Sequence, residues 1–99
     1  MNNNLNNYAL ISVYDKRNIE IIANFLKNNN YKIISTGGTL KHLKDLGFDI
    51  IDISEYTSFP EILNGRVKTL HPKVYGGILS LRENNNHIDT NKKYNIPYI

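Results

Sequence analysis

Short apolar runs alternate with stretches of helical periodicity over the first half of the chain. The apolar runs cover residues 8–13, 32–34 and 48–53, and between them apolar side chains recur every three or four positions. This pattern predicts a β-α-β-α-β series, in which crossover helices leave the sheet parallel. Right-handed crossovers bring the carboxyl ends of the strands to one edge, where ligands bind in such sheets.

Two amphipathic helices are expected between the three strands. The asparagines at positions 28–30 should stop the first helix, and Gly47 should close the second. The residues expected on their apolar faces are Ile19, Ile22, Ala23 and Leu26 in the first helix, and Leu40, Leu43 and Leu46 in the second.

The periodicity fails after Ile53. Glycines and prolines punctuate the following thirty or so positions, which predict a long structured loop with one helical turn after Pro60 and a return to helix over residues 74–81. Loops of this length in compact domains are usually functional. The asparagine-rich segment from residue 84 is expected to be solvated, with a strand beginning at the last apolar residues.

The composition sets limits on the class of protein. The 99 residues, of which 40% are hydrophobic, suffice for one domain over residues 8–99 behind a disordered tail at residues 1–7. There is no cysteine, which excludes thiol chemistry and disulfides. No apolar run is long enough to cross a bilayer and the opening residues lack a secretory signal, so we expect a cytoplasmic protein without a membrane partner.

A small, hydroxyl-rich turn follows the second predicted strand. Residues 35–39 read STGGT, and the paired glycines allow a ligand to approach the main chain closely. If a helix begins near Thr39, its free amide groups and positive dipole end suit a phosphate. The alternative interpretation is a tight strand-to-helix turn that Thr39 caps.

The first predicted strand delivers polar side chains to the same edge. Ser12, Tyr14, Asp15 and Lys16 follow its apolar core. Asp15 either caps the first helix or faces a ligand. Lys16 lies near a helix start, where its charge opposes the dipole, and this favours a nearby anion.

The densest positive stretch, GRVKTLHPK, covers residues 65–73. Arg66 and Lys68 alternate with Val67, so an extended backbone places both cations on one face, where they can hold one anion. The alternative is a solvated loop face. His71 precedes a proline and is held extended, either as a hydrogen-bond donor or as a packing residue.

Several other kinds of site are disfavoured. No histidines stand at metal-ligand spacing and no carboxylate cluster suits a hard cation, so we predict no metal. His42 is expected to be solvated on the second helix. The turn lacks the lysine of a P-loop, and there is no nucleophile elbow. The seven tyrosines are dispersed and do not alternate with basic residues, which argues against a nucleic-acid partner.

Three stretches together resemble one family: ISVYDK at 11–16, ISTGGT at 34–39, and FPEILNGRVKTLHPKVYGGIL at 59–79. The sequence is similar over residues 8–99 to the N-terminal domain of the bifunctional purine biosynthesis protein, which joins IMP cyclohydrolase to AICAR formyltransferase. The resemblance implies a methylglyoxal-synthase-like, three-layer α/β/α fold of Rossmann-like type. This fold agrees with the parallel sheet predicted from the periodicity.

The resemblance also implies an activity. In such enzymes this domain closes formyl-AICAR to IMP with loss of water and needs no cofactor, and the full-length enzyme is expected to be a homodimer. Lys68 is the expected catalytic residue. The residues that the resemblance implies for binding of the purine nucleotide monophosphate are Ser12, Tyr14, Asp15, Lys16, Thr36, Gly37, Gly38, Thr39, Arg66, Val67, Lys68 and Thr69.

The sequence departs from the family pattern at three points. Tyr14 stands where a small hydroxyl residue is more usual, and Tyr75 stands where a histidine is usual. The family's motif resembling Asn-Leu-Tyr-Pro-Phe, with an acid/base aspartate and lysine, would follow residue 99, so we expect a domain truncated at its C-terminus and no folate site. The alternative functions are a non-catalytic phosphate-ligand-sensing regulatory domain of the same fold and, less favoured, a methylglyoxal synthase.

Overall fold

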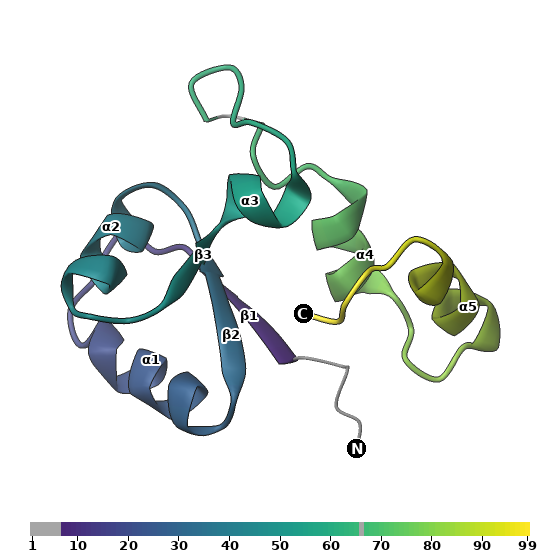
Figure 1. The fold of residues 1–99 in the computed structure, drawn as a ribbon, viewed down its shortest axis with the longest axis horizontal. Helices are drawn as coiled ribbons and strands as arrows, with labels where there is room; N and C mark the ends of the chain where they lie inside the picture. The colour runs from purple at the N-terminus through teal and green to yellow at the C-terminus, as the bar shows by residue number, and fades with distance from the viewer. Residues whose placement is uncertain (1–6, 66) are drawn as a thin grey trace.

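The computed structural model describes residues 7–65 and 67–99, and its ribbon is drawn in Figure 1. Residues 1–6, most of the expected tail, lie outside the described residues. The strands are β1 (Asn7–Ile11), β2 (Tyr31–Ser35) and β3 (Ile50–Asp52). The helices are α1 (Ile19–Asn28), α2 (Gly37–Asp45), α3 (Ile53–Thr57), α4 (Pro72–Leu79) and α5 (Asn85–Lys93).

The three strands form one parallel sheet in the order β1-β2-β3, which confirms the predicted β-α-β-α-β series. Ile11 pairs with Ser35, and Ser35 in turn pairs with Asp52, so the carboxyl ends of all three strands are in register. The strand predicted over residues 48–53 is shorter than expected, because α3 begins directly at Ile53. The sheet edge predicted to carry the site is therefore built as expected.

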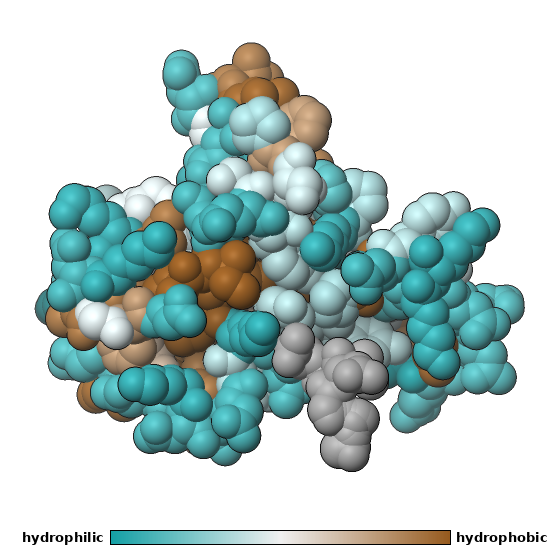
Figure 2. Space-filling view, in the orientation of Figure 1, coloured by the Kyte–Doolittle hydropathy of each residue, from teal (hydrophilic) through white to brown (hydrophobic). Residues whose placement is uncertain are grey.

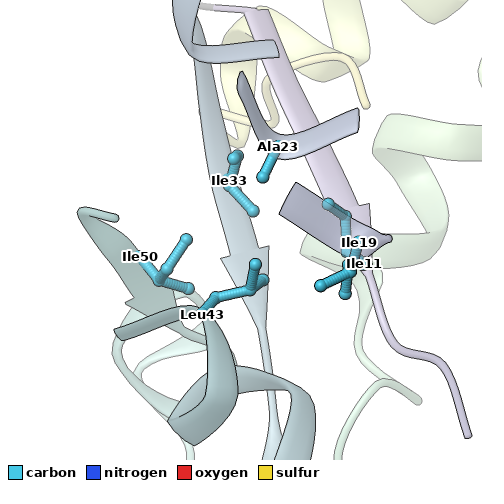
Figure 3. Packing of buried hydrophobic residues seen from close by; sticks show 6 residues of the cluster. All are labelled: Ile11, Ile19, Ala23, Ile33, Leu43 and Ile50. Atoms are coloured by element: carbon cyan, nitrogen blue, oxygen red, sulfur yellow. The ribbon is translucent and has the colours of Figure 1, made fainter. Parts of the chain in front are cut away.

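Alternate side chains of the strands enter two separate cores, as the period of two in a strand requires. Figure 3 shows the first core, in which α1 and α2 pack on one face of the sheet. Its buried members are Ile11, Ile19, Ala23, Ile33, Leu43 and Ile50. The second core joins the other face to α3 and α4, with buried members Ile34, Ile53, Tyr56 and Val74. Helices thus cover both faces, and the three-layer α/β/α architecture is confirmed.

Most residues expected on the apolar faces of the two crossover helices are buried or half-buried, and the exceptions lie at the edges of those faces. Ile19 and Ala23 are buried, but Ile22 is 52% exposed. At 100° per residue Ile22 lies about 60° from Ile19 around the helix, at the edge of the stripe that faces the sheet. Leu46 is also 48% exposed, because α2 ends at Asp45 and Leu46 is its C-cap.

Both predicted helix stops are confirmed. α1 ends at Asn28, and Asn30 adopts a left-handed backbone with φ 64°. Gly47 follows the C-cap of α2 with φ 95° and donates its amide to the Lys44 carbonyl. Asparagine and glycine adopt this conformation more readily than other residues, which explains why they end the helices.

The segment after β3 is more helical than the sequence suggested. α3 occupies the start of the expected loop, and its N-cap Asp52 accepts a hydrogen bond from the Ser54 amide. The helical turn expected after Pro60 is absent from the described residues there; instead Ile62 and Val67 form an isolated antiparallel bridge around a non-helical turn, in which the Gly65 amide donates to the Ile62 carbonyl. Figure 1 shows that this loop protrudes from the rest of the ribbon. In Figure 2, apolar side chains gather at its tip. Its exposed apolar residues are Phe59, Ile62, Leu63 and Leu70.

Two further helices differ from the prediction at the C-terminal side. α4 begins at Pro72, earlier than the expected residue 74, because the His71 side chain accepts a hydrogen bond from the Lys73 amide and caps the helix. α5 occupies a segment expected to be a solvated loop, and Asn84 caps it in the same way. The last four residues form no strand. Within the described part of the chain, no helix has the length and apolar character needed to span a membrane.

Paired glycines let the C-terminal segment pack closely on α4. The Ile99 amide donates a hydrogen bond to the Gly77 carbonyl at 3.1 Å. A Cβ atom built on Gly77 would lie 2.5 Å from the Pro97 carbonyl oxygen, a backbone atom. On Gly76 the nearest atom would be the flexible Cδ1 of Ile96, at 3.1 Å. Of these two glycines, only Gly77 would place a methyl group against a backbone atom, which cannot move away as the Ile96 side chain can.

We expect Gly77→Ala to lower the free energy of unfolding by about 1–3 kcal/mol relative to Gly76→Ala. Both substitutions gain the same helix propensity, about 0.8–1.0 kcal/mol, so their difference isolates the contact with the C-terminal segment. Urea unfolding followed by circular dichroism measures this difference. Equal stability of the two variants would show that the segment does not pack on α4 in this way.

Candidate anion-binding site

Buried hydroxyl groups fasten the ends of the first two strands to each other and to α2. Ser35 is fully buried and donates its hydroxyl to the Ile11 carbonyl at 2.7 Å. The Thr39 hydroxyl accepts a hydrogen bond from the Val13 amide at 3.1 Å and donates one to the Val13 carbonyl at 3.0 Å. These contacts place the segment after β1 against the first turn of α2.

The STGGT turn is a helix start that no side chain caps. α2 begins at Gly37, two residues before the expected Thr39, and its N-cap is Thr36, whose side chain makes no capping hydrogen bond. Thr39 is therefore not the cap but a buried residue of the helix. Gly37 has φ 57°, a left-handed backbone that allows the helix to begin directly behind β2. The first turn carries no acidic residue, so its amide groups and positive dipole end suit an anion.

Two lysines from distant parts of the chain reach this turn. A Cβ atom built on Gly38 would lie 3.6 Å from Cε and 3.8 Å from Nζ of Lys16. One built on Gly37 would lie 4.0 Å from Nζ of Lys68. The structure therefore brings together Lys16, Lys68 and the paired glycines, as the sequence predicted, and side chains at the glycines would occupy the space between the two cations.

The two lysines are held differently. Lys16 Nζ donates hydrogen bonds to the Val13 and Tyr14 carbonyls, each at 3.2 Å, and these fix its position beside Gly38. Lys68 belongs to the loop between α3 and α4, where its side chain also passes 3.9 Å from the position of a Cβ atom on Gly65. One cation is thus tied to the edge of the sheet and the other is brought to it by a loop.

Glu61 is a site residue that the sequence analysis missed. Its Oε2 accepts a hydrogen bond from the Thr36 hydroxyl at 3.1 Å. Thr36 is 2% exposed, so the carboxylate lies against a nearly buried N-cap. The two residues are 25 positions apart and neither belongs to a periodic pattern, so the sequence held no signal for this contact.

Several predicted site residues have exposed side chains or make other contacts. Tyr14 is 99% exposed, and Ser12 is also exposed. Asp15 does not cap α1, whose N-cap is Asn18 without a side-chain hydrogen bond. Instead the Asp15 carboxylate accepts hydrogen bonds from the Arg17 amide and guanidinium. The guanidinium holds the pKa of Asp15 below its ordinary value, while the carboxylate raises the pKa of Arg17.

The GRVKTLHPK stretch contributes unevenly. Val67 and Thr69 are half-buried, with Val67 in the bridge to Ile62, and the predicted ligand Arg66 lies outside the described residues. His71 takes neither of its two predicted roles, hydrogen-bond donor or packing residue: its Nδ1 accepts a hydrogen bond from the Lys73 amide and caps α4. His42 is exposed on α2, as expected.

Two cavities lie near the loop and α4. One of about 190 Å³ runs beneath the loop and is lined by Thr57, Phe59, Ile62, Val67, Lys68, Leu70 and His71. A larger cavity of about 860 Å³ lies between α4 and α5, has a mostly apolar lining and shares no lining residue with the glycine turn. Over residues 7–65 and 67–99 the structure holds no group of three histidine or acidic side chains that could bind a metal.

Comparison with known proteins decides the family. Residues 18–99 match the family model described as the MGS-like domain. The chain belongs to this family. Curated relatives of this MGS-like domain include bifunctional purine biosynthesis protein PurH from Clostridium acetobutylicum, 56% identical over 89% of the chain, and that from Caldicellulosiruptor bescii, 52% identical over 93%. The domain spans 18% of the length of each.

A solved structure supports the same fold. The crystal structure of ForH superposes on the MGS-like domain with a TM-score of 0.86 at 39% sequence identity, covering 94% of this chain and 47% of that one. Both the resemblance drawn from the three sequence stretches and the fold that it implied are therefore confirmed. The relatives' names connect the family to purine biosynthesis.

We expect Thr39→Val to lower the free energy of unfolding by about 1–2 kcal/mol, because the Val13 amide loses its partner and the Val13 carbonyl keeps only its hydrogen bond from Lys16 Nζ. Thr90→Val is the matched control, since the Thr90 hydroxyl is exposed and bonds only to the Asn86 carbonyl of its own helix. Chemical unfolding of the two variants makes the comparison. If Thr39→Val loses no more unfolding free energy than Thr90→Val, the hydrogen bonds between Thr39 and Val13 do not stabilise the fold.

Proposed function

We propose that this MGS-like domain binds a purine nucleotide monophosphate and performs the IMP cyclohydrolase step, closing formyl-AICAR to IMP with loss of water. The observation that carries the proposal is the uncapped start of α2, flanked by the ammonium groups of Lys16 and Lys68. A phosphate dianion matches the cation Lys16 and a row of free amides, and Lys68 is left for another part of the same ligand. The purine biosynthesis names of the relatives support a nucleotide of the purine class.

The 5′-phosphate is assigned to the residues that are most firmly held. Thr36, Gly37, Gly38 and Thr39 offer the helix start, and Lys16 lies beside Gly38 in a position fixed by two carbonyls. Because the phosphate does not change during ring closure, a rigid grip on it orients the rest of the substrate without hindering the reaction. Ser12, Arg66 and Thr69 remain predicted contacts.

Lys68 is assigned to the reacting end of the substrate. In ring closure the carboxamide nitrogen attacks the formyl carbon, a C–N bond forms, and the carbonyl electron pair moves onto the formyl oxygen. That oxygen takes up one proton from the attacking carboxamide nitrogen and one from the formamide nitrogen and leaves as water while the ring C=N bond forms, so no electrons pass to a cofactor. A fixed ammonium group stabilises the negative charge that develops on the formyl oxygen.

A regulatory domain of the same fold, which senses a phosphate ligand without turning it over, is the second candidate. Such a domain needs only the STGGT turn. Lys68 belongs to a separate loop, and its Nζ lies 4.0 Å from the position of a Cβ atom on Gly37. A second cation that binding of phosphate at the turn does not require favours the enzyme. A homodimer in the full-length protein, implied by the family resemblance, stays a prediction.

We expect IMP to bind this chain at least about 100-fold more tightly than inosine, since only IMP carries the phosphate that meets the charged groups. Isothermal titration calorimetry measures both affinities. Lys16→Ala should weaken IMP binding by about tenfold or more and leave inosine binding unchanged. Lys41→Ala is the control, because that exposed lysine pairs with Asp45 along α2. Equal affinity for nucleotide and nucleoside would contradict the phosphate assignment.

We expect Lys68→Ala to lower kcat for IMP formation by about 10²–10³-fold with only a modest loss of IMP affinity, as for removal of a group that stabilises developing charge. The assay uses the Clostridium acetobutylicum relative with this chain substituted for its matching segment. The same chimera without the mutation sets the reference rate. Unchanged turnover in the variant would remove Lys68 from the reaction.

A further inference from the structure

An exposed carboxylate lies against the start of α2, the turn that should hold an anion. Glu61 Oε2 accepts the Thr36 hydroxyl at 3.1 Å. Its Oε1 lies 3.4 Å, and Lys68 Nζ 3.9 Å, from one point, the position of a Cβ atom on Gly65. The carboxylate therefore bonds to the N-cap of α2 and shares its loop with Lys68, although no ion pair joins these two described side chains. It occupies the hydroxyl to which an anion at this helix start would also bond.

The Thr36 hydroxyl cannot serve two acceptors at once. A hydroxyl has one proton to donate, and in this structure it goes to Glu61. Thr36 is 2% exposed, so its side chain has little room to reach a second partner elsewhere. A phosphate at the helix start would meet both a hydroxyl that is already engaged and a nearby like charge, which repels it.

We propose that Glu61 is an internal competitor for the ligand anion: it takes the anion's place on Thr36 in the free protein and leaves when a phosphate binds. This inference rests on the proposed function, because it presumes that the phosphate binds at the start of α2. The competition lowers affinity for every anion, but a dianion gains more from Lys16 and the helix start than a singly charged carboxylate does. Glu61 thereby favours phosphate esters over carboxylates.

The competition also concerns the loop that carries Lys68. Glu61 and Lys68 belong to the same protruding segment between α3 and α4, and the Thr36 bond ties that segment to α2. When phosphate displaces the carboxylate, this tie is exchanged for contacts between the ligand and Lys68. The loop is thus held near the site in the free protein and is held by the ligand afterwards.

The test uses Glu61→Gln, which keeps the shape and an acceptor oxygen for Thr36 but removes the charge. We expect this variant to bind inorganic phosphate and IMP about tenfold more tightly than the wild type, with inosine unchanged, and to lose part of its preference for phosphate over acetate. Glu55→Gln, which removes an exposed carboxylate from α3, is the control for net charge and should bind like the wild type. Titration calorimetry at one ionic strength compares all three proteins.

The outcomes separate this inference from the proposed function. If the wild type binds IMP and Glu61→Gln binds it equally or more weakly, Glu61 is a structural tie and the competition is wrong, while the phosphate site stands. If neither protein binds phosphate or IMP, the proposed function fails and the inference fails with it. Should Glu61→Gln not fold, Glu61→Ala replaces it, with the same tighter binding expected and the same contrary result.

Discussion

The hydrogen bonds of Thr39 and Ser35 are the contacts on which the candidate site depends. Ser35 joins the ends of β1 and β2, and Thr39 fastens Val13 to α2. Because Lys16 bonds to the carbonyls of Val13 and Tyr14, the hydrogen bonds of Thr39 to Val13 also set the position of Lys16. Without those bonds, nothing would hold the Lys16 side chain at a fixed distance from Gly38. The pairing of a cation with the helix start therefore follows from buried hydroxyls, not from proximity in the sequence.

The second core explains why the C-terminal half of the described chain stays close to this edge. Tyr56 of α3 packs with Ile34, Ile53 and Val74, and its ring lies 5.3 Å from that of Tyr8 and 4.5 Å from Lys73 Nζ. Burial raises the pKa of Tyr56 to about 12. A neutral, buried ring thus joins α3, α4 and the sheet. The loop between these helices, which brings Lys68 and Glu61 to the turn, has both ends held by this core.

The sequence predicted the sheet, its two crossover helices and the edge at which the strands end, because apolar residues at fixed periods report which faces are buried. It did not predict α3, which has five residues and is too short to show a period. It also missed α5, whose sequence NNHIDTNKK holds one apolar residue; that helix instead depends on the Asn84 cap and on Asn91, which is buried and bonds to Ser80. Pattern analysis cannot detect elements that polar contacts specify.

The same distinction applies within the site. Lys16 and the glycines were predicted to meet because both follow strands of one parallel sheet, Lys68 was placed with them by the family resemblance, and the structure brings all of them together. Glu61 was not predicted, because a carboxylate is unexpected beside an anion site and its bond to Thr36 spans 25 positions. Asp15 was expected either to cap α1 or to face a ligand, but its carboxylate forms an ion pair with Arg17.

The central claim is that the start of α2 holds a phosphate, and solution NMR of the ¹⁵N-labelled chain during titration with IMP tests it most directly. The account predicts that the amides of Gly37, Gly38 and Thr39 show the largest, saturable shifts, while that of Gly47, in a turn with no atom within 4 Å of its Cβ position, stays constant. Shifts confined to the cavity between α4 and α5, with the three amides of the turn unmoved, would contradict it.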